Sequence, residues 1–485
     1  MKNEDNKNLT KNIKSLVVFF TICFFSIIVY LSYFNLYVGD KILNDPSNKR
    51  IRAEENKILR GSILDANGKV ITHSERVDED SQKRIYDMGE TFSHIVGYNS
   101  YVYGKTGIEN TFNDILQGKP TGHDVFGSIF RSLRDSLSKE EKRGSDVLLT
   151  LESPLQKAAL KALGDDFGAV VAINPKTGEV LASVSTPTFD PQNIEKNFKK
   201  YNRDEKNTPL INRATQGYYP PGSVFKIVTA AAAYEHVPSI AESIITCNGK
   251  LEFGKYILKD YGSTSHGSIS MGEAIKKSCN YFFGQLGVEI GSKNLVSTAE
   301  KFMFNKSIPE DLGKYTIPIK TGSIKIEDEK NKSFIAQDAI GQHNVVANPM
   351  QMAMVASAVA NDGKLMAPYI VREVRDRTGK TIDKPKPNLL SETMSGNTAN
   401  ELTKFMVSVV KGGTGTNAKV SGVEVAGKTG SAQDESKDAT HSWFIGFAPA
   451  NNPKIAIAII VENGGLGGKR AASIAQKVLS TYFNK

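Results

Sequence analysis

The stretch Tyr218-Tyr-Pro-Pro-Gly-Ser-Val-Phe-Lys226 runs directly into Ile227-Val-Thr-Ala-Ala-Ala-Ala233. Prolines interrupt preceding structure and the alanine-rich run favours a helix, so a helix is predicted to begin close to Ser223. A hydroxyl at that place lies near free N–H groups and the positive end of the helix dipole, which stabilise developing negative charge. Lys226 follows one turn later on the same face. The pair therefore predicts a serine nucleophile and its lysine base.

A lysine can act as a base only when its pKa lies well below the ordinary value of about 10.4. Burial or a neighbouring positive charge would lower that pKa, and Lys428 is the candidate for the charge. The alternative interpretation is a helix-capping Ser223 followed by an unrelated lysine. The Pro-Pro-Gly lead and the apolar helix favour the catalytic interpretation.

Two further patterns follow along the chain, Ser278-Cys279-Asn280 and Lys428-Thr429-Gly430-Ser431. A second hydroxyl beside an amide can relay a proton and hold a peptide. A lysine on a strand edge can bind a carboxylate, and a glycine beside it lets a substrate backbone approach. Helix capping alone would explain Ser278 and Asn280. Their pattern indicates a catalytic role only because it lies between the Ser223-x-x-Lys226 and Lys428-Thr429-Gly430 patterns.

Lys-Thr-Gly occurs four times, at Lys105, Lys176, Lys320 and Lys428. The copy at Lys320 is the strongest competitor because Ser323 also fits, but a polar run follows it. Lys428 is preferred because strand-like runs precede it at 423–426 and follow it at 443–449. Residues 422–429 also match the phosphate-loop pattern G-x-x-x-x-G-K-T, which needs a strand before it and a helix after it. Loop-like and polar segments occupy those places and argue against a nucleotide site.

In this order the patterns S-x-x-K, S-x-N and K-T-G resemble those of the penicillin-binding, active-site-serine acyltransferases. Residues 60–68, Arg-Gly-Ser-Ile-Leu-Asp-Ala-Asn-Gly, resemble the R-G-x-I-x-D-x-x-G element of high-molecular-weight penicillin-binding proteins. Residues 104–109, Gly-Lys-Thr-Gly-Ile-Glu, resemble the G-x-x-G-x-E end of the same N-terminal pedestal. The chain thus resembles a monofunctional class B penicillin-binding protein (peptidoglycan D,D-transpeptidase), similar to the short penicillin-binding protein A type.

The resemblance implies two-step acyl transfer. Ser223 would attack the D-Ala–D-Ala bond of a stem peptide, and an amine of a neighbouring stem would then take the acyl group. Ser278 would pass a proton to the leaving amine, and Asn280 would orient Lys226 and the peptide. β-Lactams would trap Ser223 as a stable acyl-enzyme.

The same resemblance assigns substrate binding to the third motif. Lys428 would hold a carboxylate, and the neighbouring Thr429, Gly430 and Ser431 would lie along the substrate. The backbone N–H groups of Ser223 and Ser431 would form the oxyanion hole.

Residues 15–39 contain no charged residue and are dense in Phe, Ile, Val and Leu. As a helix rising about 1.5 Å per residue, they would exceed the roughly 30 Å of membrane hydrocarbon. A cleaved signal peptide is the alternative, but aromatic residues stand where small ones would mark cleavage, at Tyr30, Tyr33, Phe34 and Tyr37. Lysines precede the segment, at Lys2, Lys7, Lys11 and Lys14. We therefore expect an uncleaved cell-membrane anchor with a cytoplasmic N-terminus and an extracytoplasmic catalytic domain.

Strand-like runs at both ends of the remaining chain enclose a helical centre, which predicts an α+β fold. The resemblance implies an antiparallel sheet with a helical subdomain, as in serine β-lactamases, on a smaller N-terminal pedestal. The expected division is a cytoplasmic tail at 1–14 and a transmembrane helix at 15–39. A dimerisation-like pedestal at 40–144 and a transpeptidase domain at 145–485 would follow.

Composition argues against several other classes of protein. The chain has 485 residues and a formal net charge of +9 without a concentrated basic patch, so nucleic-acid binding is not expected. Cys23 lies in the predicted anchor, and Cys247 and Cys279 alone form no disulfide framework. We interpret Cys279 as a small packed residue. The seven histidines include no H-E-x-x-H pair, and neither a metal nor another cofactor is expected.

The resemblance implies three partners: stem peptides, β-lactams and a multi-pass glycosyltransferase of the shape, elongation, division and sporulation (SEDS) type. Too few residues precede Gly144 for a glycosyltransferase domain, and no C-terminal wall-binding module is expected, so this chain would cross-link strands made by its partner. The anchor and residues 60–68 would form the contact. The alternatives are a β-lactam sensor or non-catalytic scaffold, and a D,D-carboxypeptidase or β-lactamase that uses water as acceptor.

Overall fold

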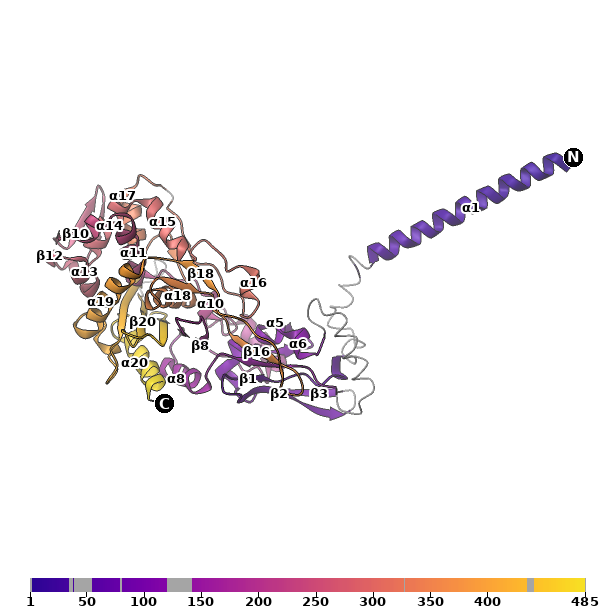
Figure 1. Cartoon of the computed structure of the whole chain (residues 1–485), viewed down its shortest axis with the longest axis horizontal. Coiled ribbons are helices and arrows are strands. Elements are labelled where there is room, and N and C mark those ends of the chain that lie inside the picture. The colour runs from indigo at the N-terminus through magenta and orange to yellow at the C-terminus, as the bar shows by residue number, and fades with distance from the viewer. Residues whose placement is uncertain are drawn as a thin grey trace.

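The computed structural model describes residues 2–34, 38, 55–78, 81–119, 142–326, 328–433 and 440–484. Its first helix, α1 (Lys2–Tyr33), contains the apolar segment Lys11–Tyr33, which has a mean hydropathy of 2.4 and no buried part. Figure 1 shows α1 standing apart from the rest of the chain. The segment is long enough to cross a membrane, as predicted for 15–39; residues 35–37 and 39 of that prediction lie outside the described residues.

A five-stranded antiparallel sheet forms the centre of the larger part of the chain, with strand order β19-β20-β21-β7-β8. Two strands come from near residue 170, β7 (Gly168–Ile173) and β8 (Val180–Thr186), and are joined by a tight turn at 174–178. Three come from the C-terminal end, β19 (Ala426–Gln433), β20 (Thr440–Ala448) and β21 (Ile455–Val461). The α+β prediction is confirmed, and β19 lies at the edge of the sheet.

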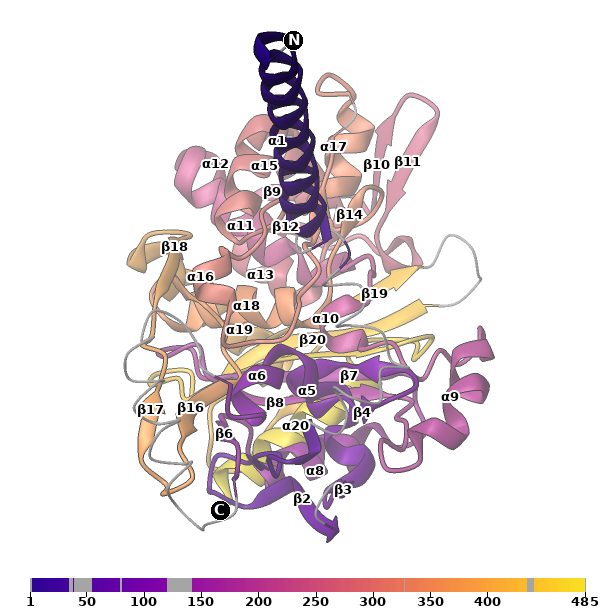
Figure 2. The ribbon, with the colours of Figure 1, turned by 90° about the vertical axis from the view of Figure 1, so that its right-hand side faces the viewer.

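Helices cover both faces of this sheet, as Figure 2 shows for α18 and α8 on opposite sides of the strands. Successive residues of β7 face opposite sides of the sheet: Val171 packs into one apolar cluster and Val170 into another. The first cluster includes α18 (Pro349–Ala360), whose residues are all buried. The second includes α8 (Ser153–Leu163) and α20 (Arg470–Phe483). A strand between two helical layers has no solvated face, which explains the near-continuous apolar runs.

The middle of the chain forms a helical subdomain beside β19. Its main helices are α11 (Lys226–His236), α13 (Met271–Lys277), α14 (Asn280–Ile290), α15 (Ser292–Lys301), α17 (Lys332–Ala339) and α19 (Gly396–Gly412). Two small antiparallel pairs, β9 (Ile245–Cys247) with β12 (Gly267–Ile269) and β10 (Lys250–Phe253) with β11 (Tyr256–Lys259), extend it. Shorter elements are α9 (Ile194–Arg203), α10 (Arg213–Gln216), α12 (Pro238–Ala241), α16 (Glu310–Gly313), β13 (Ser323–Ile324), β14 (Val345–Val346), β15 (Lys364–Met366) and β18 (Leu389–Glu392).

A second sheet, of six strands in the order β17-β16-β6-β1-β2-β3, contains the N-terminal strands. These are β1 (Ile63–Leu64), β2 (Val70–Asp78) and β3 (Ser81–Ile85), and a hairpin turn that includes Asn67 and Gly68 joins the first two. The other three come from later in the chain, β6 (Asp146–Leu149), β16 (Val371–Arg375) and β17 (Thr381–Asp383). Continuous strand pairing therefore joins the N-terminal part to the part that carries the larger sheet.

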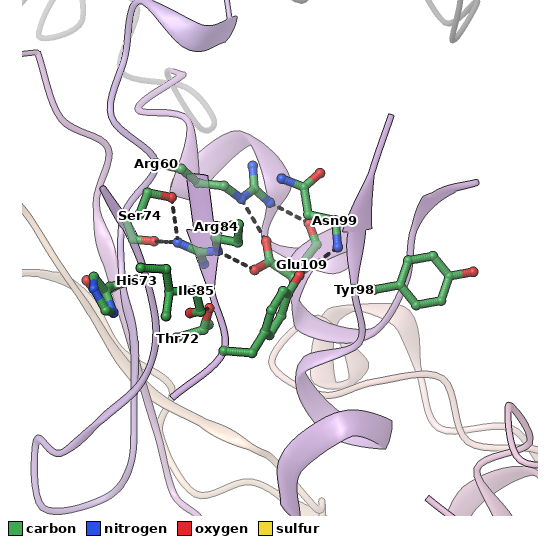
Figure 3. Close-up of polar contacts among 12 residues, drawn as sticks. Arg60, Thr72, His73, Ser74, Arg84, Ile85, Tyr98, Asn99 and Glu109 are labelled. Atoms are coloured by element: carbon green, nitrogen blue, oxygen red, sulfur yellow. Dashed lines mark hydrogen bonds and ion pairs between the residues drawn. The ribbon is translucent and has the colours of Figure 1, made fainter. Parts of the chain in front are cut away.

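A buried cluster of three charges fastens the N-terminal sheet to the short helix α5 (Gly107–Thr111) (Figure 3). Arg60 Nε and Arg84 Nε each donate to one carboxylate oxygen of Glu109 at 2.7 Å. Arg60 also donates to the Glu109 main-chain oxygen, and Arg84 donates to the Gly61 main-chain oxygen, both at 2.7 Å. The Glu109 carboxyl is completely buried. The charged ends of the two pedestal motifs recognised in the sequence are thus bonding partners.

One predicted strand differs from the structure. The run at 423–426 was expected to be a strand before Lys428, but only Ala426 belongs to β19, which continues to Gln433. Val420 and Val423 instead bridge each other across a tight turn in which Gly422 has φ of +72°. The Lys-Thr-Gly motif therefore lies inside a strand, which also rules out the phosphate-loop geometry at 422–429.

The charge cluster predicts a measurable effect of Glu109→Gln. Burial disfavours the charged carboxyl, but Arg84 and Arg60 outweigh it and hold the pKa of Glu109 below its ordinary 4.5. The substitution leaves two buried guanidinium groups without a counter-charge, and we expect local stability to fall by about 3–5 kcal/mol at pH 7. Hydrogen–deuterium exchange of the β2 and β3 amides measures that change.

The pH dependence provides the control. Because the folded-state pKa is depressed, the contribution of Glu109 is fully present above about pH 4.5 and is lost as the pH falls through the lower folded-state value. The difference between parent and variant should therefore shrink in acid. Glu75→Gln, at an exposed position on β2, should change exchange little. Equal protection of β2 and β3 in parent and Glu109→Gln at pH 7 would contradict the proposed role of the cluster.

Candidate active site

Ser223 lies in a single 3-10 turn (Gly222–Val224) immediately before α11, at the helix start that the sequence predicts. The preceding Tyr219 exchanges two main-chain hydrogen bonds with Ala347, at 3.0 and 2.9 Å. Trp443 Nε1 on β20 donates to the Pro220 main-chain oxygen at 3.1 Å. These contacts fix the proline-rich lead, and with it the serine, against both the sheet and the helical layer.

Gly222 lets this turn lie directly on the edge strand β19. Its φ is +56°, in the left-handed region that favours glycine. A Cβ at this position would stand 3.1 Å from Ala432 Cβ and 3.3 Å from the Ser431 main-chain oxygen. The absence of a side chain therefore lets the turn that carries Ser223 pack against the strand that carries Ser431.

Lys226 is fully buried, and its ammonium is held by the second motif. Nζ donates to the main-chain oxygen of Ser278 at 2.7 Å and to Asn280 Oδ1 at 2.7 Å. The Ser278 hydroxyl lies 3.5 Å away. Asn280 is oriented in turn by its Nδ2, which donates to the Lys259 main-chain oxygen at 2.9 Å.

The second motif forms the junction between α13 and α14. Ser278 has left-handed backbone angles, φ 60° and ψ 40°, and ends α13. Cys279 then caps α14, its sulfur accepting the N–H of Phe282 at 3.3 Å. Such a backbone conformation is uncommon for residues other than glycine.

Lys428 approaches the same hydroxyl from the other side. Its Nζ donates to Ser278 Oγ at 2.8 Å and to the Thr429 main-chain oxygen at 2.8 Å, and the side chain is fully buried. The structure therefore brings Lys226, Ser278, Asn280 and Lys428 into one network. Ser278 Oγ is the atom that the two ammonium groups share.

Burial controls the protonation of both lysines. It lowers the pKa of Lys226 to about 8, with part of the effect offset by negative charge nearby, including Asp260. Burial also lowers the pKa of Lys428 well below 10.5, and the charge of Lys226 lowers it further. Burial, one of the two expected causes, therefore lowers the pKa of Lys226, whereas the charge expected from Lys428 is not among the causes of that shift.

The other three Lys-Thr-Gly copies lie away from this network. Lys105 is in β5 (Gly104–Lys105), 3.7 Å from Glu55. Lys176 is in the β7–β8 turn, where its Nζ donates to Asn452. Lys320 stacks its ammonium 4.7 Å from the centre of the Tyr218 ring. Only the copy at Lys428 lies on β19 beside the serine turn.

The rest of the third motif lies on the edge strand. Thr429 Oγ1 is 2.6 Å from Thr414 Oγ1, and Ser431 Oγ accepts the N–H of Gly467 at 3.1 Å. A Cβ at Gly430 would stand 3.1 Å from the Pro221 main-chain oxygen, so glycine permits the close packing of the serine turn. Sequence reasoning missed Thr414, whose only signal is its place in the glycine-rich segment 412–415.

Sequence reasoning also missed Asp260, a buried carboxylate that binds the N–H groups of Asn280 and Tyr281. No short motif surrounds it, so only the fold reveals it. Burial, and then the Asp260 charge, raise the pKa of the neighbouring Cys279 thiol. That thiol is therefore a poor nucleophile, in agreement with its interpretation as a packed residue.

Comparison with known families agrees with this geometry. A model of the penicillin-binding protein transpeptidase domain matches residues 168–480, and one of the penicillin-binding protein A dimerisation domain matches residues 60–147. Among curated proteins, peptidoglycan D,D-transpeptidase PbpA of Mycolicibacterium smegmatis is 31% identical over 476 residues, covering 93% of this chain and 94% of that protein. Peptidoglycan D,D-transpeptidase MrdA of Acinetobacter baumannii is 31% identical, covering 84% and 66%.

Solved structures give the same result. Penicillin-binding protein A from M. tuberculosis, as a penicillin G acyl-enzyme complex, superposes with a TM-score of 0.80 at 30% identity, covering 88% of this chain and 100% of that one. The D,D-transpeptidase domain of a peptidoglycan glycosyltransferase from Eggerthella lenta gives 0.78 at 33% identity, covering 88% and 99%. Sequence, fold and site geometry therefore agree that the chain belongs to the penicillin-binding protein transpeptidase family, with an N-terminal domain of the penicillin-binding protein A dimerisation type.

Proposed function

We propose that this chain is a peptidoglycan D,D-transpeptidase that works through an acyl-enzyme on Ser223 and is inhibited covalently by β-lactams. The observation that carries the proposal is the Ser278 hydroxyl held between two buried lysines, Lys226 and Lys428, beside the serine turn. The relatives named PbpA and MrdA are peptidoglycan D,D-transpeptidases, and the penicillin G complex of penicillin-binding protein A is an acyl-enzyme.

Acylation requires the neutral, unprotonated form of Lys226. In its neutral form Lys226 accepts the proton of Ser223 Oγ, which bonds to the carbonyl carbon of the penultimate D-Ala. The N–H groups of Ser223 and Ser431 hold the oxyanion. The proton then passes through the Ser278 hydroxyl to the amine of the terminal D-Ala, the C–N bond breaks, and D-Ala leaves.

Transfer reverses the proton path. The amine of a neighbouring stem peptide attacks the ester carbon, its proton passes back through the same groups, and Ser223 Oγ recovers a proton as the new amide forms. In a β-lactam the amide is part of a ring, so the leaving amine stays attached after the ring opens. It continues to occupy the place of the acceptor, which makes the acyl-enzyme stable.

Lys428 is proposed to recognise the carboxylate of the donor peptide or β-lactam, with Thr429 and Gly430 lying along the substrate. Without substrate, burial and Lys226 lower the pKa of Lys428. An arriving carboxylate favours the protonated form, so binding and proton uptake by Lys428 are coupled. Thr414, bonded to Thr429, would help to set the width of that end of the site.

The function can be tested by turnover of a thioester analogue of the donor peptide with an amine acceptor. Ser223→Ala should abolish both turnover and penicillin labelling while the chain stays folded, because only one hydroxyl is lost at a helix start. Amide product would identify a transpeptidase, whereas free acid alone would identify a carboxypeptidase. Penicillin binding without any turnover would identify a sensor or scaffold. Covalent labelling that persists in Ser223→Ala would contradict the assignment.

The repeated Lys-Thr-Gly motif supplies a matched control for that assay. Lys428→Ala should slow acylation by about a hundredfold or more, because it removes an ammonium from the Ser278 hydroxyl. Lys320→Ala removes the same side chain from the same tripeptide outside the network and should leave acylation nearly unchanged. A larger loss in Lys320→Ala at equal thermal stability would overturn the placement of the third motif.

The membrane orientation and the domain division belong to the same proposal. Lysines before α1 favour a cytoplasmic N-terminus and an extracytoplasmic catalytic domain. The division into 1–14, 15–39, 40–144 and 145–485 is supported by the apolar helix and by the two family matches. A membrane-impermeant penicillin conjugate should label this chain in intact cells; labelling only after lysis would contradict the orientation.

The proposed partner is a SEDS-type membrane glycosyltransferase, which would make the glycan strands that this chain cross-links. Within residues 60–68, Arg60 is buried and Asn67 and Gly68 are exposed, so this turn, with the exposed Lys69 that follows it, is the part that a partner can reach. The apolar helix would supply the contact inside the membrane.

Replacing 15–39 by an unrelated transmembrane helix, together with Lys69→Glu, should abolish co-purification with that enzyme, because both contacts are lost. Penicillin acylation should be unchanged. The matched control is Lys176→Glu, an exposed turn lysine on the catalytic part, which should leave co-purification intact. Undiminished co-purification of the doubly altered chain would refute this contact surface.

A further inference from the structure

Four side chains with metal-binding atoms converge behind the second motif: Cys247, Asp260, His266 and Cys279. One atom from each, the two sulfurs, a carboxylate oxygen and an imidazole nitrogen, lies within 4.8 Å of all the others. They come from four separate places in the subdomain, namely the end of β9, the loop after β11, the residue before β12 and the cap of α14. Both cysteines and Asp260 are buried, and the His266 side chain is 15% exposed.

The distances between these atoms lie within a few tenths of an ångström of those in a tetrahedral metal site, and the two sulfur–oxygen distances are the short ones. Asp260 Oδ2 lies 3.1 Å from Cys247 Sγ, 3.2 Å from Cys279 Sγ and 3.3 Å from His266 Nδ1. Cys247 Sγ lies 3.4 Å from Cys279 Sγ and 3.5 Å from His266 Nδ1. Zinc bound at about 2.3 Å by sulfur and about 2.0–2.1 Å by nitrogen or oxygen would separate its ligand atoms by about 3.3–3.8 Å.

The kinds of ligand select the metal. Two thiolates, an imidazole and a carboxylate suit Zn²⁺, whereas Mg²⁺ and Ca²⁺ prefer sites built from oxygen. Four protein ligands leave no open position, which is typical of a structural zinc site rather than a catalytic one. We propose that Cys247, Asp260, His266 and Cys279 bind one Zn²⁺ that fixes the position of the second catalytic motif.

The effect on the active site follows from chain connectivity. Cys279 stands between Ser278 and Asn280, the residues that hold Lys226, so a metal on its sulfur anchors both neighbours. The other oxygen of Asp260 accepts the N–H of Tyr281 at 3.3 Å and also that of Asn280. One ion would thereby tie β9, the loop at 260–266 and the start of α14 to the turn that presents the Ser278 hydroxyl.

Two other states of the same residues make different predictions. Cys247 and Cys279 are close enough in the fold to form a disulfide, which would leave Asp260 and His266 without a role as ligands. Alternatively the thiols stay protonated and donate to Asp260, with a charged His266 beside it and no metal. Binding of Zn²⁺ requires both thiols to lose their protons to solvent. Metal content and thiol count together distinguish these states.

The test uses the full-length chain, purified in detergent without chelator. We expect about one zinc per chain by elemental analysis, and three cysteine thiols after denaturation, including Cys23. Replacing zinc by Co²⁺ should give the intense visible and near-ultraviolet absorption of a tetrahedral site with thiolate ligands. Stripping zinc with a strong chelator should lower the melting temperature and slow penicillin acylation, and Zn²⁺ but not Mg²⁺ should restore both.

Two histidine variants provide a matched comparison. His266 and His343 are both partly exposed, and each places Nδ1 3.3 Å from a buried aspartate oxygen. Only His266 has sulfur neighbours among the residues that the structure describes. His266→Asn should therefore reduce zinc retention against chelator at least tenfold, while His343→Asn should retain zinc as the parent does.

Three results would overturn the proposal. The first is a folded parent chain without zinc that takes up no Zn²⁺ after reduction. The second is a thiol count of one, which would establish the disulfide. The third is equal zinc retention in His266→Asn and His343→Asn. Metal content and thiol count are measured on the parent chain, so they remain decisive even where a variant fails to fold, and neither depends on the proposed reaction.

Discussion

The site depends on two lysine ammonium groups that are both buried and both directed at one serine hydroxyl. Removing a lysine from water disfavours its charge, and a second lysine beside it disfavours that charge further. Hydrogen bonds from Lys226 to Ser278 and Asn280, and from Lys428 to Ser278 and Thr429, hold the pair in place. The result is a buried lysine, one helical turn after Ser223, whose pKa is lowered to about 8.

Two features of the backbone create that arrangement. The left-handed turn at Ser278 presents its hydroxyl between α13 and α14, and Gly222 lets the serine turn rest on β19. The short sequence motifs alone do not hold these two turns in position. The helical layers on both faces of the five-stranded sheet, and the helical subdomain, must also be folded. The six-stranded sheet contains strands from both the N-terminal part and the part that carries the site, so the site also depends on the folding of the N-terminal part. There Glu109 accepts hydrogen bonds from two arginines, Arg60 and Arg84.

Much of this could be predicted from the sequence because spacing along a helix or a strand is local information. Ser223 and Lys226 are one turn apart, and the order of the motifs separated Lys428 from its three copies. Pairings between distant segments could not be predicted in this way. Arg60 with Glu109, Thr414 with Thr429, and Asp260 with Asn280 all require the fold. The prediction of a strand at 423–426 was wrong because Val423 instead pairs with Val420 across a tight turn.

The central claim is that burial makes Lys226 a base near neutral pH. The most direct test is the pH dependence of the second-order rate constant for acylation by a penicillin, measured from initial rates. Since burial lowers the pKa of Lys226 to about 8, its neutral fraction and the rate should rise about tenfold per unit below pH 7 and level off above about pH 9. A rate that still rises tenfold per unit beyond pH 9, or one that is flat from pH 6 to 9, would contradict it.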